Sequence, residues 1–231
     1  SSILPQIQIK SNSHLECDSG PVTVLTNGSL TIDGDFTSKE AIIDANKSIS
    51  ITSSSVWKVS DTIRLTSGDD TTMDGDINGK NVIYKVGKNL NIKSSSVWKL
   101  SGSMSATVGL QAKIDGDIDA SVADLDIGDD ATISTSSVWN VKKSFSASIG
   151  GHLHHSGSLL CATDGCLISI ETSGLKKSSS VTGKLQATGY MSKIRWISSY
   201  DADVTGSSLI QASDIYIQSN GSMEEGTDYQ P

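Results

Sequence analysis

Apolar and polar residues alternate with a period of two along most of the chain, and the same alternation returns 41 residues later. One apolar set occurs in three copies: Ala41, Ile43, Ala45; Val82, Tyr84, Val86; and Ala123, Leu125, Ile127. Because successive side chains of a strand point to opposite faces, this pattern predicts β-strands with one buried face. The i, i+3, i+4 spacing of an amphipathic helix is absent.

Two short motifs keep the same interval of 41 residues. Ser-Val-Trp occurs at residues 55–57, 96–98 and 137–139, and Asp-Gly-Asp occurs at residues 33–35, 74–76 and 115–117. A period shared by two motifs indicates a repeat protein. The motifs divide each repeat into halves of 20 and 21 residues, so we predict that one repeat forms two coils of a β-solenoid.

Overlaying the half-repeats predicts an inward column of large apolar side chains: Phe36, Trp57, Ile77, Trp98, Ile118, Trp139 and Leu159. If parallel strands stack about 4.8 Å apart, successive tryptophans lie about 9.6 Å apart with an aliphatic residue between them. The alternative is that a corner near Ser53 turns the tryptophans outward, as a ladder on which sugar rings stack. We favour the core, because Trp57 shares the parity of Ile51 and Val59.

The predicted fold class is all-β, with about nine coils of 20–21 residues over residues 25–218. Residues 1–24 are expected to form an N-terminal segment or cap, and residues 219–231 a C-terminal tail. The regular register weakens after Trp139, because the next Ser-Val element, Ser180-Val181, arrives 43 residues later. The alternation then resumes with less regular spacing.

Gly-Ser-Leu-Thr-Ile at residues 28–32 and the inward columns make the chain resemble the parallel β-helix. Its coils of about 20 residues look most similar to the shafts of filamentous-haemagglutinin-type adhesins. This resemblance covers most of the chain. It implies a right-handed, single-stranded β-helix and a structural or adhesive protein.

The charge of the chain limits its partners. The net charge is −8, and Arg64 and Arg195 are the only arginines, which argues against a nucleic-acid partner. No apolar run approaches the roughly 18 residues that a membrane span requires, so no span is predicted. The chain begins at Ser1 without an initiator Met or an apolar leader, and we expect a processed protein or a segment of a longer one.

Cysteines and sequons favour an extracellular or cell-surface glycoprotein. Cys161 and Cys166 flank a four-residue loop and are expected to form a local disulfide, which leaves Cys17 free. N-glycosylation sequons occur at Asn27, Asn46 and Asn220.

Paired aspartates are the clearest candidate ligands. Each Asp-Gly-Asp motif places two carboxylates on one outward face: Asp33, Asp35, Asp74, Asp76, Asp115 and Asp117. Such pairs are a candidate Ca²⁺ site, with Asp69, Asp70, Asp129 and Asp130 as extra ligands, because Ca²⁺ prefers six to eight oxygens. We favour solvated turns, since Ser54 and Val56 lie between successive pairs and separate them by about 9.6 Å. No other cofactor is expected.

His152, His154 and His155 form the one histidine cluster. Two imidazoles on one side of a strand suit a transition metal. We favour ordinary outward positions for His152 and His154, with His155 in place of an inward apolar residue.

These observations favour a non-catalytic extracellular protein, a rigid shaft that displays a surface or assembles end to end into a fibre. Its expected partners are cell-surface or matrix glycans or proteins, or further copies of itself. A glycan-binding module is the alternative. A polysaccharide lyase or glycosidase is the second alternative. The aspartates argue against it, because they recur at equivalent positions in each repeat, whereas a catalytic acid and a catalytic base need different environments.

Overall fold

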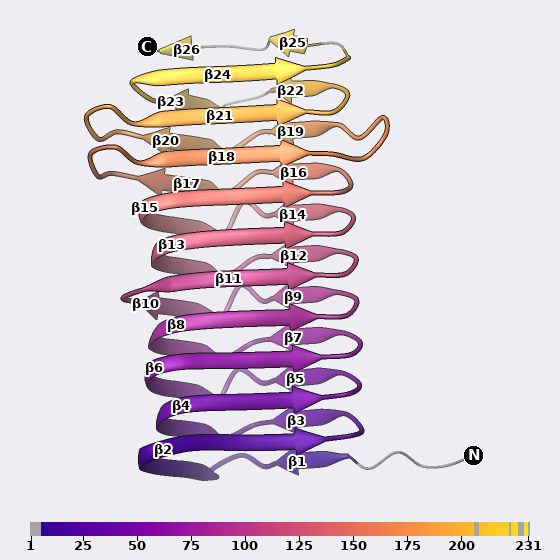
Figure 1. Ribbon diagram of the computed structural model, residues 1–231, viewed down its shortest axis with the longest axis vertical. Helices are drawn as coiled ribbons and strands as arrows, with labels where there is room; N and C mark the ends of the chain where they lie inside the picture. The colour runs from indigo at the N-terminus through magenta and orange to yellow at the C-terminus, as the bar shows by residue number, and fades with distance from the viewer. Residues whose placement is uncertain (1–5, 206–207, 222, 226–228, 231) are drawn as a thin grey trace.

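The chain winds into an all-β solenoid of about ten turns (Figure 1). The computed structural model describes residues 6–205, 208–221, 223–225 and 229–230. Within them every strand pair is parallel and no helix occurs. The long strands facing the viewer in Figure 1 run from left to right while the chain rises, and the short strands return behind them, so the winding is right-handed.

Short strands stack into one sheet, which we call the first face. Among the described residues it has 11 strands: β1 (Ile7–Ile9), β3 (Leu30–Ile32), β5 (Ile49–Ile51), β7 (Thr71–Met73), β9 (Leu90–Ile92), β12 (Ala112–Ile114), β14 (Ala131–Ile133), β16 (Leu153–His155), β19 (Ser179–Val181), β22 (Ala202–Val204) and β25 (Met223–Glu225).

Long strands and their divided equivalents form the other sheet. In the described part of the chain it contains β2 (His14–Thr26), β4 (Asp35–Ala45), β6 (Val56–Ser67), β8 (Asp76–Val86), β10 (Val97–Leu100), β11 (Ser103–Val108), β13 (Asp117–Ile127), β15 (Val138–Ile149), β17 (Ser158–Cys161), β18 (Leu167–Thr172), β20 (Lys184–Ala187), β21 (Lys193–Ser198), β23 (Leu209–Gln211), β24 (Asp214–Ser219) and β26 (Tyr229–Gln230).

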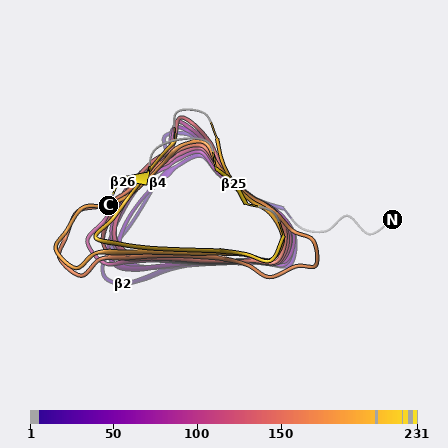
Figure 2. The same ribbon diagram turned by 90° about the horizontal axis from the view of Figure 1, so that it is seen from above.

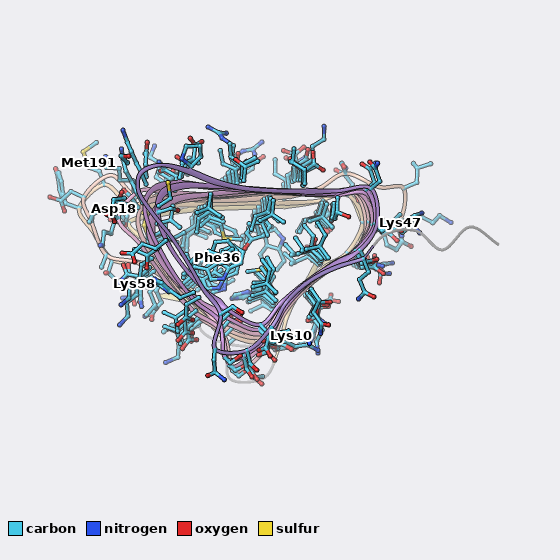
Figure 3. All side chains as sticks on the ribbon, turned by 90° about the horizontal axis from the view of Figure 1, so that it is seen from below. Lys10, Asp18, Phe36, Lys47, Lys58 and Met191 are labelled. Atoms are coloured by element: carbon cyan, nitrogen blue, oxygen red, sulfur yellow. A yellow bond between two sulfur atoms is a disulfide. The ribbon has the colours of Figure 1, made fainter. Side chains whose placement is uncertain are left out.

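The long strands bend halfway, and this bend gives the solenoid a triangular cross-section (Figure 2). Their first halves, such as residues 35–38, form the second face, and their second halves, such as residues 41–45, form the third face. The first corner joins the first and second faces, the second corner is the bend, and the third corner leads back to the first face. Figure 3 shows Lys10 at the first corner, Asp18 beside the second and Lys47 at the third.

Between Leu30 and Leu153, turns of two lengths alternate and together give the period of 41. Leu30 pairs with Ile49 after 19 residues, and Ile49 pairs with Thr71 after 22. The longer turn has four residues at the first corner, 52–55, where the shorter turn has two. It also has one extra residue at the second corner, where the register shifts between Ser38 and Glu40. The extra residues therefore fall at corners and leave the core register intact.

The core consists of columns of apolar side chains that run along the solenoid axis. All seven residues of the column expected on the second face, from Phe36 to Leu159, are at most 1% exposed and pair in register from turn to turn. Trp57 contacts Phe36 with ring centroids 4.8 Å apart, and Trp98 stacks on Tyr84 at 5.5 Å. The tryptophans therefore pack inside the protein and offer no ladder to a ligand.

Strand pairing extends beyond residues 25–218 at both ends. β1 pairs with β3 and β2 pairs with β4, so the residues expected to form an N-terminal segment supply a first turn. β24 pairs with β21 up to Ser219, and β25 and β26, which lie in the expected tail, pair with β22 and β23. This extra turn gives about ten turns in place of nine. Residues 1–5 and parts of the expected tail, at 222, 226–228 and 231, lie outside the described residues, and a capping role for the first turn stays a prediction.

Candidate functional site

The second aspartate of each Asp-Gly-Asp motif binds the Ser-Val-Trp motif of the next turn. The main-chain N–H of Val56 donates to Asp35 Oδ1 at 2.8 Å. In the same way, Val97 donates to Asp76 Oδ1 and Val138 donates to Asp117 Oδ1, both at 2.9 Å. The serine that precedes each of these valines is buried and donates to a main-chain carbonyl of the turn before. The two motifs share one period because they are the two halves of one contact between turns.

The first aspartate of each motif accepts hydroxyl groups from the following turn. Asp33 accepts from Ser54 and Thr52, Asp74 accepts from Ser95, and Asp115 accepts from Ser134. The Ser54 and Thr52 hydroxyls hold the pKa of Asp33 below its usual value. These carboxylates are thus already engaged in bonds that connect successive turns.

The central glycine of the motif is required by close packing of the main chain. A Cβ on Gly75 would lie 2.8 Å from the carbonyl oxygen of Ser55, and one on Gly34 would lie 2.7 Å from that of Ser13. Both distances are too short for a non-bonded contact. The motif therefore has a structural explanation at all three of its positions.

Ca²⁺ binding by these aspartates stays a prediction. Asp69, Asp70, Asp129 and Asp130 lie at the third corner, separated from the first corner by strands such as β7. Four residues from Asp70 to Asp74 span about 13 Å in a strand, so the two sets cannot hold one ion. No group of three or more His, Cys, Asp or Glu side chains suited to a metal occurs among the residues that the structure describes.

The histidines do not converge on a common point. His155 is buried, and its Nε2 lies 3.1 Å from the carbonyl oxygen of Lys184, to which the neutral ring donates. Burial lowers the pKa of His155 to about 4. His152 Nδ1 accepts the N–H of Ser178, while His154 Nδ1 lies 2.7 Å from Ser180 Oγ.

Cys161 and Cys166 form a disulfide beneath two stacked loops at the second corner, while Cys17 is free. Residues 162–165 contact residues 188–192: the N–H of Gly165 donates to the carbonyl of Tyr190, and the N–H of Tyr190 donates to Asp164 Oδ1. Tyr190 is 76% exposed. The loops project from the side of the solenoid, at the left of Figure 1.

The sequon asparagines Asn27, Asn46 and Asn220 are exposed and all lie at the third corner. Asn27 and Asn46 are on neighbouring turns, and Asn46 Nδ2 donates to Asn27 Oδ1 at 3.1 Å. Ser222 of the third sequon lies outside the described residues. Glycosylation of these residues stays a prediction.

A groove of about 530 Å³ at the second corner, over the first turns, has no counterpart in the sequence-based prediction. Lys39 and Lys58 line it together with hydroxyl and amide side chains, including Thr37, Ser60 and Asn78. Figure 3 shows Lys58 and Asp18 pointing outward from the same side of the solenoid. The one sequence signal for a hollow was Gly79, which stands where the neighbouring repeats have Ser38 and Ala120.

Comparisons with protein-family models, with curated proteins and with solved structures find no match to this chain. In the part of the chain that the structure describes, no helix is long and apolar enough to cross a membrane.

Proposed function

We propose that this protein is a non-catalytic extracellular shaft, a rigid solenoid that displays a surface for adhesion or spaces other parts of a structure. The observation that carries this proposal is the unbroken stack of parallel turns, in which main-chain hydrogen bonds and side-chain columns both run along the axis. Each turn contacts its neighbours above and below, so bending the rod would open many contacts at once.

Two further observations support this proposal over catalysis. The paired carboxylates of the three Asp-Gly-Asp motifs have equivalent surroundings, whereas general acid and base groups need different ones. They also bond to the main chain or to hydroxyl groups of the next turn. A disulfide suits the extracellular location that the proposal includes.

Small-angle X-ray scattering over a concentration series tests the shaft. We expect a rod, with about ten turns spanning about 48 Å along the axis at a strand spacing of about 4.8 Å. A constant length at all concentrations fits a monomeric shaft, and growth in length with concentration fits a fibre. A compact globule would contradict the proposal, as would release of sugar fragments when the protein is incubated with polysaccharides.

A further inference from the structure

Hydrogen-bond donors dominate the groove at the second corner. Lys39 and Lys58 are exposed, and no ion pair to either occurs among the described residues. Thr37, Ser60 and Asn78 add hydroxyl and amide groups. Asp18 is the one carboxylate among the described residues that line the groove, so its local charge is positive although the chain carries −8.

The equivalent place one repeat later has larger side chains and an ion pair. Ala120 stands in the position of Gly79, and Lys142 stands in the position of Ser101. Lys142 pairs with Asp119, with 3.7 Å between Nζ and Oδ1. These differences between equivalent positions make the groove a local feature of the turns over residues 17–101.

Gly79 leaves room for the groove because it has no side chain. A Cβ at this residue would lie 2.7 Å from the carbonyl oxygen of Val59, so no side chain fits there without movement of the main chain. The inward neighbour Ser38 is also small, and its hydroxyl bonds to the carbonyl of Glu40. A rigid main chain therefore forms the hollow, which does not depend on the conformation of a mobile loop.

We infer that this groove binds an acidic glycan, a hydroxyl-rich chain that carries carboxylate or sulfate groups. Unpaired ammonium groups bind such anions through charge-assisted hydrogen bonds. The neighbouring hydroxyl and amide groups suit sugar hydroxyls, and a volume of about 530 Å³ exceeds what a single ion requires. The inference rests on the proposed display function, because it names the class of ligand that the displayed surface takes.

The lysine spacing suits an extended chain that lies along the axis. Lys58, Asn78 and Lys99 form one outward column on successive turns, so the two ammonium groups are about 9.6 Å apart. A smaller hollow of about 200 Å³ beside Lys99 is also lined by Asp117 and Asp119, so the acidic ligand is expected in the groove at the second corner and not in this hollow. The carboxylates of Asp35 and Asp76, in the neighbouring column, each accept a main-chain N–H.

The test compares binding of length-matched oligosaccharides to the whole protein. The probes are a uronate oligomer, a sulfated oligomer and a neutral β-1,4-linked glucose oligomer, measured at low and at physiological salt. We expect an acidic oligomer to bind, the neutral one to bind at least about tenfold more weakly, a difference of about 1.4 kcal/mol, and salt to weaken the binding. Binding of only the uronate or only the sulfated oligomer would identify the anionic group.

Charge-reversal variants locate the site. Lys39→Glu/Lys58→Glu should reduce binding at least about tenfold. Lys10→Glu/Lys85→Glu removes two exposed lysines from other parts of the surface, with the same change in net charge, and should retain binding. Absence of binding by both acidic oligomers, equal binding of the neutral one, or equal losses in the two double variants would overturn the inference. A rod-shaped scattering profile with no binding refutes the groove alone, whereas a globular profile refutes the shaft.

Discussion

The turns over residues 30–149 and the turns over residues 153–219 hold the same solenoid together in different ways. In the earlier region, Asp-Gly-Asp and Ser-Val-Trp contacts recur at every second turn, and tryptophan occupies the second face. In the later region, the column on the second face continues with Leu185 and Ile210, and Trp196 lies on the third face. A solenoid thus tolerates unequal turns if each turn fills the core and keeps its strands in register with the turns beside it.

The later region replaces the repeated contacts with individual ones. Trp196 Nε1 donates to the buried Ser179 Oγ at 2.7 Å, and the Cys161–Cys166 disulfide closes the base of an inserted loop. Both cysteines are buried in the core. The insertion lies at the second corner, and the strands after it return to register, with Leu167 opposite Lys193. A corner accepts extra residues because they project into solvent.

Truncation of a core tryptophan in the turns over residues 30–149 should have the largest effect on the free energy of unfolding. We expect Trp98→Ala to lower the free energy of unfolding by about 3–5 kcal/mol, because the removed ring leaves a cavity between Ile77 and Ile118. Denaturant titration measures the loss. Lys99→Ala, at the exposed neighbouring position, should change it by less than about 0.5 kcal/mol. A similarly small effect of Trp98→Ala would contradict the packed column.

Acid should act on the boundary between the regions through His155. Its pKa in the folded protein is about 4, below the value of 6.5 for a solvent-exposed histidine, so the unfolded chain binds the proton more readily. The stability that the neutral ring contributes is complete above pH 6.5 and is lost as the pH falls toward 4, by roughly 3 kcal/mol.

His155→Ile, which matches Ile133 at the equivalent position of the preceding turn, isolates this effect. Because the carboxylates titrate in both proteins, the difference in unfolding free energy between them reports the histidine alone. The wild-type protein should lose more stability than the variant between pH 7 and pH 4.5. Parallel losses would show that His155 does not titrate within the core.

Removal of the disulfide should weaken only the later region. We expect Cys161→Ala/Cys166→Ala to cost about 2 kcal/mol, since the bond closes a short loop. Limited proteolysis should then cut within residues 162–165 or 188–192 before the earlier turns. Cys17→Ala is the control and should leave the cleavage pattern unchanged. Uniform cleavage along the chain would mean that the two regions unfold as one unit.

Loss of one corner contact should have the smallest effect. Asp117→Ala removes the acceptor for the N–H of Val138 and should cost about 1 kcal/mol. Asp117→Asn keeps an acceptor oxygen and should cost less. Hydrogen exchange of the Val138 amide should be faster in Asp117→Ala than in Asp117→Asn. Equal exchange in the two variants would show that the carboxylate does not protect this amide.

The sequence alone determined the strands and the columns of the core. Which face of a strand is buried depends on alternation within a few residues, and the 41-residue period aligned the halves so that Phe36, Trp57 and Ile77 shared one inward column. Both signals are local or repeat regularly, so they can be read without coordinates. The flanking cysteines likewise indicated their own pairing, because only four residues separate them.

Only the tertiary structure decided what the corners do. The bond from Asp76 to the Val97 amide and the clash that requires Gly75 join residues of neighbouring turns, about 20 apart in sequence. The groove depends on which side chains of the first turns meet at the bend, where Lys39 and Lys58 lie with a single lining carboxylate, Asp18. The alternation specifies whether each side chain points inward or outward. The distances between side chains of neighbouring turns depend on corner lengths and register shifts, which only the folded chain determines.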